Sequence, residues 1–126
     1  MSASVTEDTR IDETLELARL IAQIADDYRG ADTAILDMRS ITSICDYFVV
    51  TTATSNRQGR ALGEEVDRIM KKRGQPRLGS EGADAASVWL LHDYGDAVLH
   101  VFSPEGRELY DLERLWADAP RLERDV

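Results

Sequence analysis

The stretch 87–102, SVWLLHDYGDAVLHVF, constrains the fold of this chain more than any other segment. Two apolar and aromatic runs flank Tyr94 and Gly95, and such a pair predicts a two-residue hairpin turn. We therefore expect antiparallel strands over residues 88–93 and 96–102. Because an isolated hairpin cannot bury its apolar faces, a layered sheet is expected rather than an all-helical fold.

A turn at Tyr94 and Gly95 would fix the register, since cross-strand partners follow by counting outward from it. The expected pairs on one face are Trp89 with His100, Leu91 with Val98, and Asp93 with Asp96. The expected pairs on the other face are Leu90 with Leu99, His92 with Ala97, and Val88 with Val101. The alternative is a type I turn with a bulge, which would shift the register by one, because Tyr94 resists the positive φ of a type I′ turn.

The first of these faces has the composition of a protein-binding surface. Tyr94 is expected to leave its ring in solvent at the hairpin tip, and Trp89 lies within a polar rim. Helices that cover both faces are the alternative, since apolar strand residues usually lie in a core. The predicted partner-binding residues are Trp89, Leu91, Asp93, Tyr94, Val98 and His100.

Three helices are expected from apolar residues that recur with helical spacing. Gly30 ends the first, Ser55 and Gln58 form a capping-box pattern for the second, and Ser103 with Pro104 begins the third. Their apolar stripes are Leu17, Ile21, Ile24 and Tyr28; Leu62, Val66, Ile69 and Met70; and Leu109, Leu112, Leu115, Trp116 and Ala119.

Further strands are expected at 33–38 and 47–53, where β-branched and aromatic residues gather, and a short one near Leu78. The order αββαβββα predicts an α/β (α+β) fold, a mixed sheet with three flanking helices. We expect a flexible segment at 1–10, a single domain over 11–119 and a charged tail at 120–126.

The chain of 126 residues carries 15 Lys and Arg against 24 Asp and Glu, a net charge of −9. This field repels phosphate backbones and favours a basic protein as partner. The run Lys71-Lys72-Arg73 is expected to complement the dipole of the second helix, so any RNA contact would be peripheral.

Cysteine content and hydropathy indicate the cellular compartment. Cys45 is the only cysteine, so no intrachain disulfide can form. No apolar run reaches the roughly 20 residues of a membrane helix, and the first ten residues lack the pattern of a secretory signal. We expect a cytoplasmic protein without membrane contact.

Several residues could carry chemistry, and each has a simpler structural explanation. Cys45 with His92 or His100 could form a nucleophile and base, although buried cysteines are usually packing residues. Asp93 and Asp96 could hold Mg²⁺, although acidic residues beside a turn usually form the turn. The phosphate-loop, dinucleotide, hydrolase-elbow and zinc-protease motifs are absent. No catalytic residue, metal or cofactor is expected.

Three segments together resemble the ribosomal silencing factor S family, also called Iojap-like. They are DYFVVTTATSNRQGRAL at 46–62, EG at 81–82, and WLLHDYGDAVLHVFSPEGRELYDLERLW at 89–116. The resemblance implies a nucleotidyltransferase-like fold and homodimers. It also implies a non-enzymatic repressor that binds large-subunit ribosomal protein fourteen and sterically blocks association of the 30S and 50S subunits under nutrient limitation. In the family, the contact surface corresponds to Trp89, Asp93 and Tyr94 here.

Two alternatives remain open. One is a nucleotidyltransferase-like enzyme that uses Asp93 and Asp96 with Mg²⁺, although these residues lie across a turn and need not converge. The other is a homodimeric scaffold in which the apolar hairpin face serves only self-association.

Overall fold

The structure is a computed structural model that describes residues 2–82 and 89–122; the side chains of residues 2–12 and Leu115 lie outside this description. Its elements are α1 (Ser2–Asp27), β1 (Ala31–Asp37), β2 (Tyr47–Thr52), α2 (Asn56–Lys72), β3 (Gly79–Glu81), β4 (Trp89–Asp93), β5 (Ala97–Phe102), α3 (Pro104–Tyr110), α4 (Leu112–Leu115) and β6 (Arg121–Leu122). One six-stranded sheet has the order β3-β4-β5-β2-β1-β6. The predicted mixed α+β fold is confirmed.

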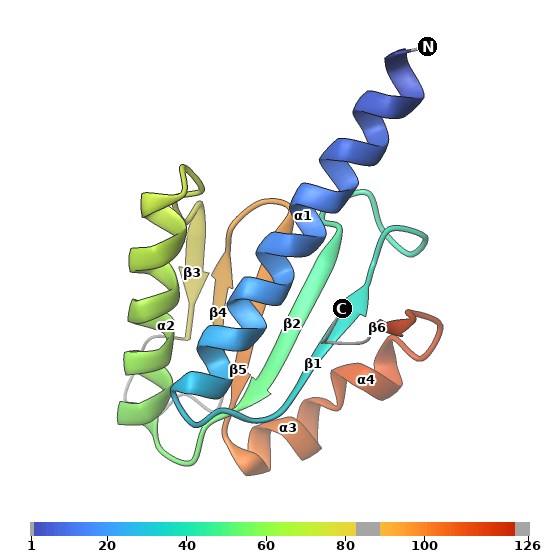
Figure 1. Cartoon of the computed structure of the whole chain (residues 1–126). Helices are drawn as coiled ribbons and strands as arrows, with labels where there is room; N and C mark the ends of the chain where they lie inside the picture. The colour runs from blue at the N-terminus through green and yellow to red at the C-terminus, as the bar shows by residue number, and fades with distance from the viewer. Residues whose placement is uncertain (1, 83–88, 123–126) are drawn as a thin grey trace.

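Helices lie on both faces of the sheet (Figure 1). α1 and α2 pack on one face over a continuous core that includes Ile21, Ile35, Val49, Leu62, Val66 and Leu99. α3 and α4 pack on the other face, over a smaller core that includes Leu36, Met38, Val50, Phe102 and Leu112. This second face is covered incompletely, because Phe48, Trp89 and Leu91 stay partly exposed.

β2 and β5 are parallel neighbours, whereas the other strand pairs are antiparallel. Their carboxyl ends, Thr52 and Phe102, lie side by side. α2 begins shortly after β2, and α3 begins shortly after β5. Both helix N termini therefore lie at the same end of the sheet, next to the carboxyl ends of β2 and β5.

The hairpin of β4 and β5 turns one residue later than predicted. The observed pairs are Trp89 with Phe102, Leu91 with His100, and Asp93 with Val98. The N–H of Tyr94 donates to the carbonyl of Ala97 at 3.0 Å, so Gly95 and Asp96 form the turn. Gly95 has φ 90°, the sign that a type II′ turn requires at its first central position. The predicted register is wrong, because Trp89 pairs with Phe102 and not with His100, a shift of two residues. Since side chains alternate along a strand, this even shift leaves each of them on its predicted face.

The predicted third helix is two helices. Asp111, a non-glycine residue with φ 44°, ends α3 and begins α4. The break directs Leu109 into solvent, where it is 74% exposed, so its predicted burial is wrong. Of the other predicted core positions, Leu112 and Ala119 are buried, Trp116 is half-buried, and the side chain of Leu115 lies outside the described residues.

The ends of the chain differ from the prediction in part. Strand β6, in which Leu122 pairs with Ile35, is not predicted from the sequence, and it extends the sheet beyond residue 119. A two-residue strand is too short to leave an alternating pattern. α1 begins at Ser2, and its first turns project beyond the sheet (Figure 1). The predicted flexibility of residues 1–10 stays a prediction, and Val88, the first residue of the predicted strand at 88–93, lies outside the described residues.

The start of α2 is tied to the end of α1. The N–H of Gln58 donates to the Ser55 hydroxyl at 3.1 Å, as the capping box predicts. The Gln58 side-chain oxygen accepts from the N–H of Thr54 instead of Ser55, so the second half of the box is displaced by one residue. The Gln58 amide group also donates to the carbonyls of Tyr28 and Arg29, at 3.0 and 2.8 Å.

Candidate functional site

The incompletely covered face of the sheet carries a row of ring side chains. We define the aromatic row as Trp116, Phe48, His100, Trp89, Phe102 and Tyr110. Ring centroids lie 6.4 Å apart for Trp116 and Phe48, 4.4 Å for Phe48 and His100, 5.7 Å for His100 and Trp89, and 4.8 Å for Trp89 and Tyr110. These separations are typical of favourable aromatic contacts. Strands β2, β4 and β5 and the two short helices build the row together, so only the folded chain contains it.

Burial divides this face into a floor and an accessible part. His100, Phe102 and Val98 are buried and form the floor. We define the open face as Phe48, Trp89, Leu91 and Tyr110, of which the first three are half-buried and Tyr110 is 42% exposed. Large apolar and aromatic groups that stay partly exposed over a rigid sheet favour a contact with another macromolecule.

The floor carries a neutral histidine. His100 Nδ1 accepts a hydrogen bond from Trp89 Nε1 at 3.0 Å, so the imidazole proton is assigned to Nε2. That nitrogen is buried and has no hydrogen-bond partner in the described part of the chain. Burial lowers the pKa of His100 to about 4. The ring is therefore uncharged at neutral pH and holds the indole of Trp89 in place.

Arg107 of α3 fixes the two short helices against the sheet. Its guanidinium donates to Thr52 Oγ1 at 2.9 Å and to the Asp32 carbonyl at 2.7 Å. It also binds both carboxylate oxygens of Glu113, at 2.8 and 3.0 Å, and thereby holds the pKa of Glu113 below its usual range. Arg121 of β6 donates to the same carboxylate at 3.1 Å. This network fixes the position of α3, which ends in the most exposed ring of the row.

Five of the six predicted partner-binding residues lie on the predicted face. They are Trp89, Leu91, Asp93, Val98 and His100. Val98 and His100 are buried and support the face from below. The carboxylate of Asp93 accepts the N–H of Gly95 at 2.8 Å and so shapes the turn, which is the simpler role considered for it.

Tyr94 lies on the opposite face, and its predicted exposure is wrong. The ring is 3% exposed because the turn falls at Gly95 and Asp96, which leaves Tyr94 under α2. The Tyr94 hydroxyl donates to Asp67 Oδ1 at 2.5 Å and lies 3.2 Å from His92 Nδ1. Burial raises the pKa of Tyr94 and lowers that of His92. Since Tyr94 binds α2 to the sheet, we leave it out of the open face.

The two histidines considered for metal or nucleophilic chemistry are not brought together. His92 and His100 lie on opposite faces of the sheet, as predicted. Among the side chains that the structure describes, no three of His, Cys, Asp or Glu are grouped closely enough to share a metal ion. Cys45 is buried, and this burial raises the pKa of its thiol to about 11. A thiol with that pKa stays protonated at neutral pH and is a weak nucleophile.

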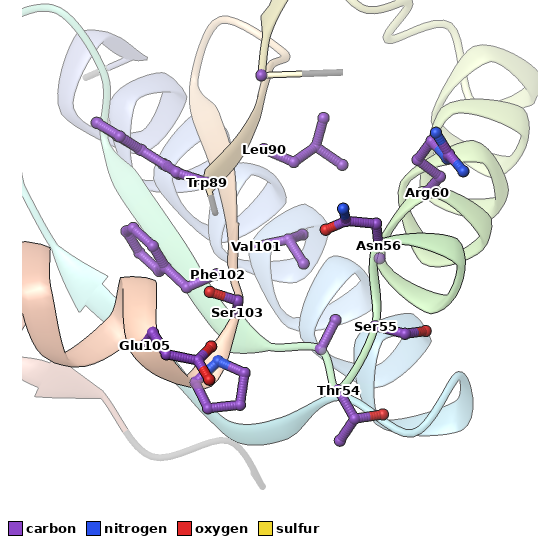
Figure 2. A pocket seen from close by; sticks show the side chains of 14 residues that line it. Thr54, Ser55, Asn56, Arg60, Trp89, Leu90, Val101, Phe102, Ser103 and Glu105 are labelled. Carbon is purple, nitrogen blue, oxygen red and sulfur yellow. The ribbon is translucent and has the colours of Figure 1, made fainter. Parts of the chain in front are cut away.

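A pocket of about 260 Å³ adjoins the aromatic row where α2 and α3 begin. Figure 2 shows Trp89 and Phe102 on one side and Arg60 of α2 on the other. The hydroxyls of Ser55 and Ser103 accept N–H groups of their own helices. The described lining contains no His, Cys or Asp. The pocket is therefore a recess in the surface beside Trp89. Its described lining offers no pair of His, Cys or Asp side chains that could act as acid and base.

Comparisons with known proteins identify the family. The family model described as "Ribosomal silencing factor during starvation" matches residues 11–126. The chain belongs to the ribosomal silencing factor family. The silencing factor of Bacillus subtilis is 37% identical over 109 residues, which cover 86% of this chain and 92% of that protein. A mouse protein named "Mitochondrial assembly of ribosomal large subunit protein 1" is 35% identical over 88 residues, or 68% of this chain and 38% of its own length.

Solved structures of the family have the same fold. A crystal structure from Chromobacterium violaceum matches with a TM-score of 0.77 and 38% identity, covering 82% of this chain and 85% of that one. One from Bacillus halodurans matches with a TM-score of 0.73 and 32% identity, covering 89% and 98%. The predicted family is confirmed. Among the described residues, no helix has the length and apolar character needed to span a membrane.

Three members of the aromatic row, Phe48, Tyr110 and Trp116, are not among the residues predicted to lie on the binding surface. Phe48 could have been found, because strand alternation places it on the face opposite Tyr47 and Val49. Tyr110 and Trp116 could not, because their positions depend on the break between α3 and α4. Helical spacing without that break assigns Trp116 to a continuous buried stripe.

Proposed function

We propose that this silencing factor binds large-subunit ribosomal protein fourteen through the open face and sterically blocks joining of the 30S and 50S subunits, repressing translation when nutrients are limited. Family membership supports the class of function, since the relatives are named for ribosomal silencing and for assembly of the large subunit. The observation that carries the proposal is the open face itself. Its apolar groups stand on a buried, uncharged floor, and among the described residues α3 and α4 cover them only in part.

Rigidity favours the open face as a binding surface. Trp89 is held by the hydrogen bond to His100 and by ring contacts with Phe102 and Tyr110. A pre-positioned indole loses little side-chain entropy on binding, so more of its contact free energy appears as affinity. Tryptophan and tyrosine are the residue types that most often dominate such interfaces.

Charge favours a basic partner. The chain carries −9 overall, and the carboxylates of Asp93 and Asp96 lie at the hairpin turn that ends the open face. Ribosomal proteins are generally cationic, so electrostatic attraction would speed their encounter with this acidic chain. Blocking requires no chemistry, because a body of 14.1 kDa seated at a subunit interface excludes the other subunit by its volume.

Binding to purified ribosomal protein fourteen tests the proposal, with Trp89→Ala as the main variant. We expect the variant to bind at least thirtyfold more weakly, or about 2 kcal/mol, because truncation empties the centre of the open face. Leu91→Lys is the second variant, since it places a cation against a basic partner without removing a ring. Tyr94→Phe is the matched control: it alters the same hairpin on the opposite face and should bind normally.

Sedimentation of 30S and 50S subunits with each protein measures blocking directly. The unmutated chain should reduce 70S formation, and folded Trp89→Ala should not. Full binding and blocking by both folded variants would remove the open face from the mechanism.

Light scattering with and without the ribosomal protein tests the homodimer, which we propose uses the same face. A dimer that persists unchanged in the complex would contradict a shared surface.

A further inference from the structure

Basic residues gather in one short part of this acidic chain. Residues 56–77 hold seven of the 15 Lys and Arg but only three of the 24 Asp and Glu, a net charge of +4. The remaining 104 residues therefore carry −13. Such a separation produces a strong local field of opposite sign to the net charge, and α2 lies at its centre.

The basic side chains share one side of α2. With 3.6 residues per turn, they fall within a sector of about 120° and extend over about 22 Å of the helix. We define the basic face as Arg57, Arg60, Arg68, Lys71 and Lys72, all of which are exposed. Glu64 is the one acidic residue within the sector. The buried positions of α2, which include Leu62, Val66 and Met70, lie on the opposite side of the helix.

Most of these cations are not used inside the protein. Arg57, Arg60, Lys71 and Lys72 form no hydrogen bond or ion pair with the residues that the structure describes. Arg68 pairs with Glu65 at 2.6 Å, yet its side chain is 54% exposed. Dipole compensation accounts for Lys71 and Lys72 in the last turn, but it cannot account for arginines in the first turns, where cations are disfavoured.

We propose that the basic face of α2 docks on the phosphate backbone of a folded RNA. Guanidinium groups bind phosphate oxygens through paired N–H donors, and three of the five cations are arginines. A membrane surface fits less well, because the apolar side of α2 is packed against the sheet and cannot insert among lipids. The negative charge elsewhere orients the molecule, so that only α2 approaches the polyanion.

This surface differs from the open face in position and in partner. α2 lies on the sheet face covered by α1, and α3 lies on the other face (Figure 1). The open face includes Tyr110 of α3, and of the basic face only Arg60 lines the pocket next to Trp89. A ribosome-bound silencing factor could therefore use both surfaces at once, one for protein and one for RNA. RNA docking goes beyond the proposed function and can hold or fail independently of it.

Fluorescence anisotropy with a labelled RNA duplex of mixed sequence and the full-length chain tests the inference. The test variant is the triple substitution Arg57→Gln, Lys71→Gln and Lys72→Gln, which retains good helix formers at exposed positions and leaves Arg60, beside the pocket, unchanged. We expect binding at low salt that weakens at least tenfold in this variant. The slope of log K against log salt should fall by about three, one for each cation removed.

Two further variants sharpen the result. Glu64→Gln removes the carboxylate within the basic face and should tighten binding. Arg114→Gln, an exposed cation on α4, is the matched control and should leave RNA binding unchanged. Circular dichroism checks that every variant is folded. The triple variant should still bind ribosomal protein fourteen, and Trp89→Ala should still bind RNA, so failure of either proposal is recognised separately.

The inference is overturned if the unmutated chain does not bind the duplex at low salt, or if the folded triple variant binds it equally well. Vesicles containing phosphatidylserine provide the remaining test. Binding to these vesicles as tight as binding to RNA would assign the basic face to a membrane and refute RNA docking.

Discussion

The buried imidazole of His100 should make the stability of this protein sensitive to mild acid. Burial lowers its pKa to about 4 in the folded chain, against an ordinary value of 6.5. Between these two pH values the unfolded chain binds a proton that the folded chain excludes. The contribution of His100 is therefore fully present above pH 6.5 and is lost as the pH falls towards 4.

The magnitude follows from the two pKa values. The loss is about 2 kcal/mol at pH 5 and about 3 kcal/mol at pH 4, relative to pH 7.5. His100→Gln should remove this loss, because glutamine does not titrate and its amide oxygen can still accept the Trp89 N–H. The difference between the two proteins isolates His100, since the carboxylates and His92 titrate in both.

Urea unfolding at pH 7.5 and at pH 5 measures the free energy of unfolding of each protein. The unmutated chain should lose about 2 kcal/mol more than His100→Gln between the two conditions. His92→Gln is the matched control, because it removes the other buried histidine and should retain the part of the acid loss that belongs to His100. If the free energy of unfolding depends on pH in the same way in the unmutated chain and in His100→Gln, the conclusion that His100 is buried in its neutral form under the open face is refuted.

Three shorter predictions concern other parts of the fold. Tyr94→Phe should lower the free energy of unfolding by about 1–2 kcal/mol in urea, because Asp67 loses the hydroxyl donor; an unchanged value would contradict that hydrogen bond. Gly63→Ala should destabilise the protein although alanine favours helix, because the added Cβ would lie 2.8 Å from the His92 ring; a higher melting temperature would show that α2 can move away. Cys45 should react with a thiol reagent at pH 8 far more slowly in the folded than in the urea-unfolded chain, given its buried thiol with a pKa of about 11; equal rates would show that the thiol is accessible.

Local patterns in the sequence predicted most elements of this fold. The apolar stripe of α2, its Ser55 cap and the strand at 47–52 each depend on residues close together in the chain, whose spacing a helix or strand imposes directly. The faces of Trp89 and Leu91 were also correct, because alternation along a strand survives an even register shift. The family resemblance rested on the same local motifs.

Tertiary structure decided where these elements expose their side chains. Because the turn begins at Gly95 and not at Tyr94, the Tyr94 ring is buried and contacts Asp67, whereas the sequence predicted it in solvent at the hairpin tip. Only packing under α2 makes that burial favourable. The break at Asp111 likewise depends on contacts that lie far apart in sequence, such as those of Arg107 with Thr52 and the Asp32 carbonyl. A sequence specifies the periodicity of each segment, but which face stays open depends on long-range contacts that local spacing does not encode.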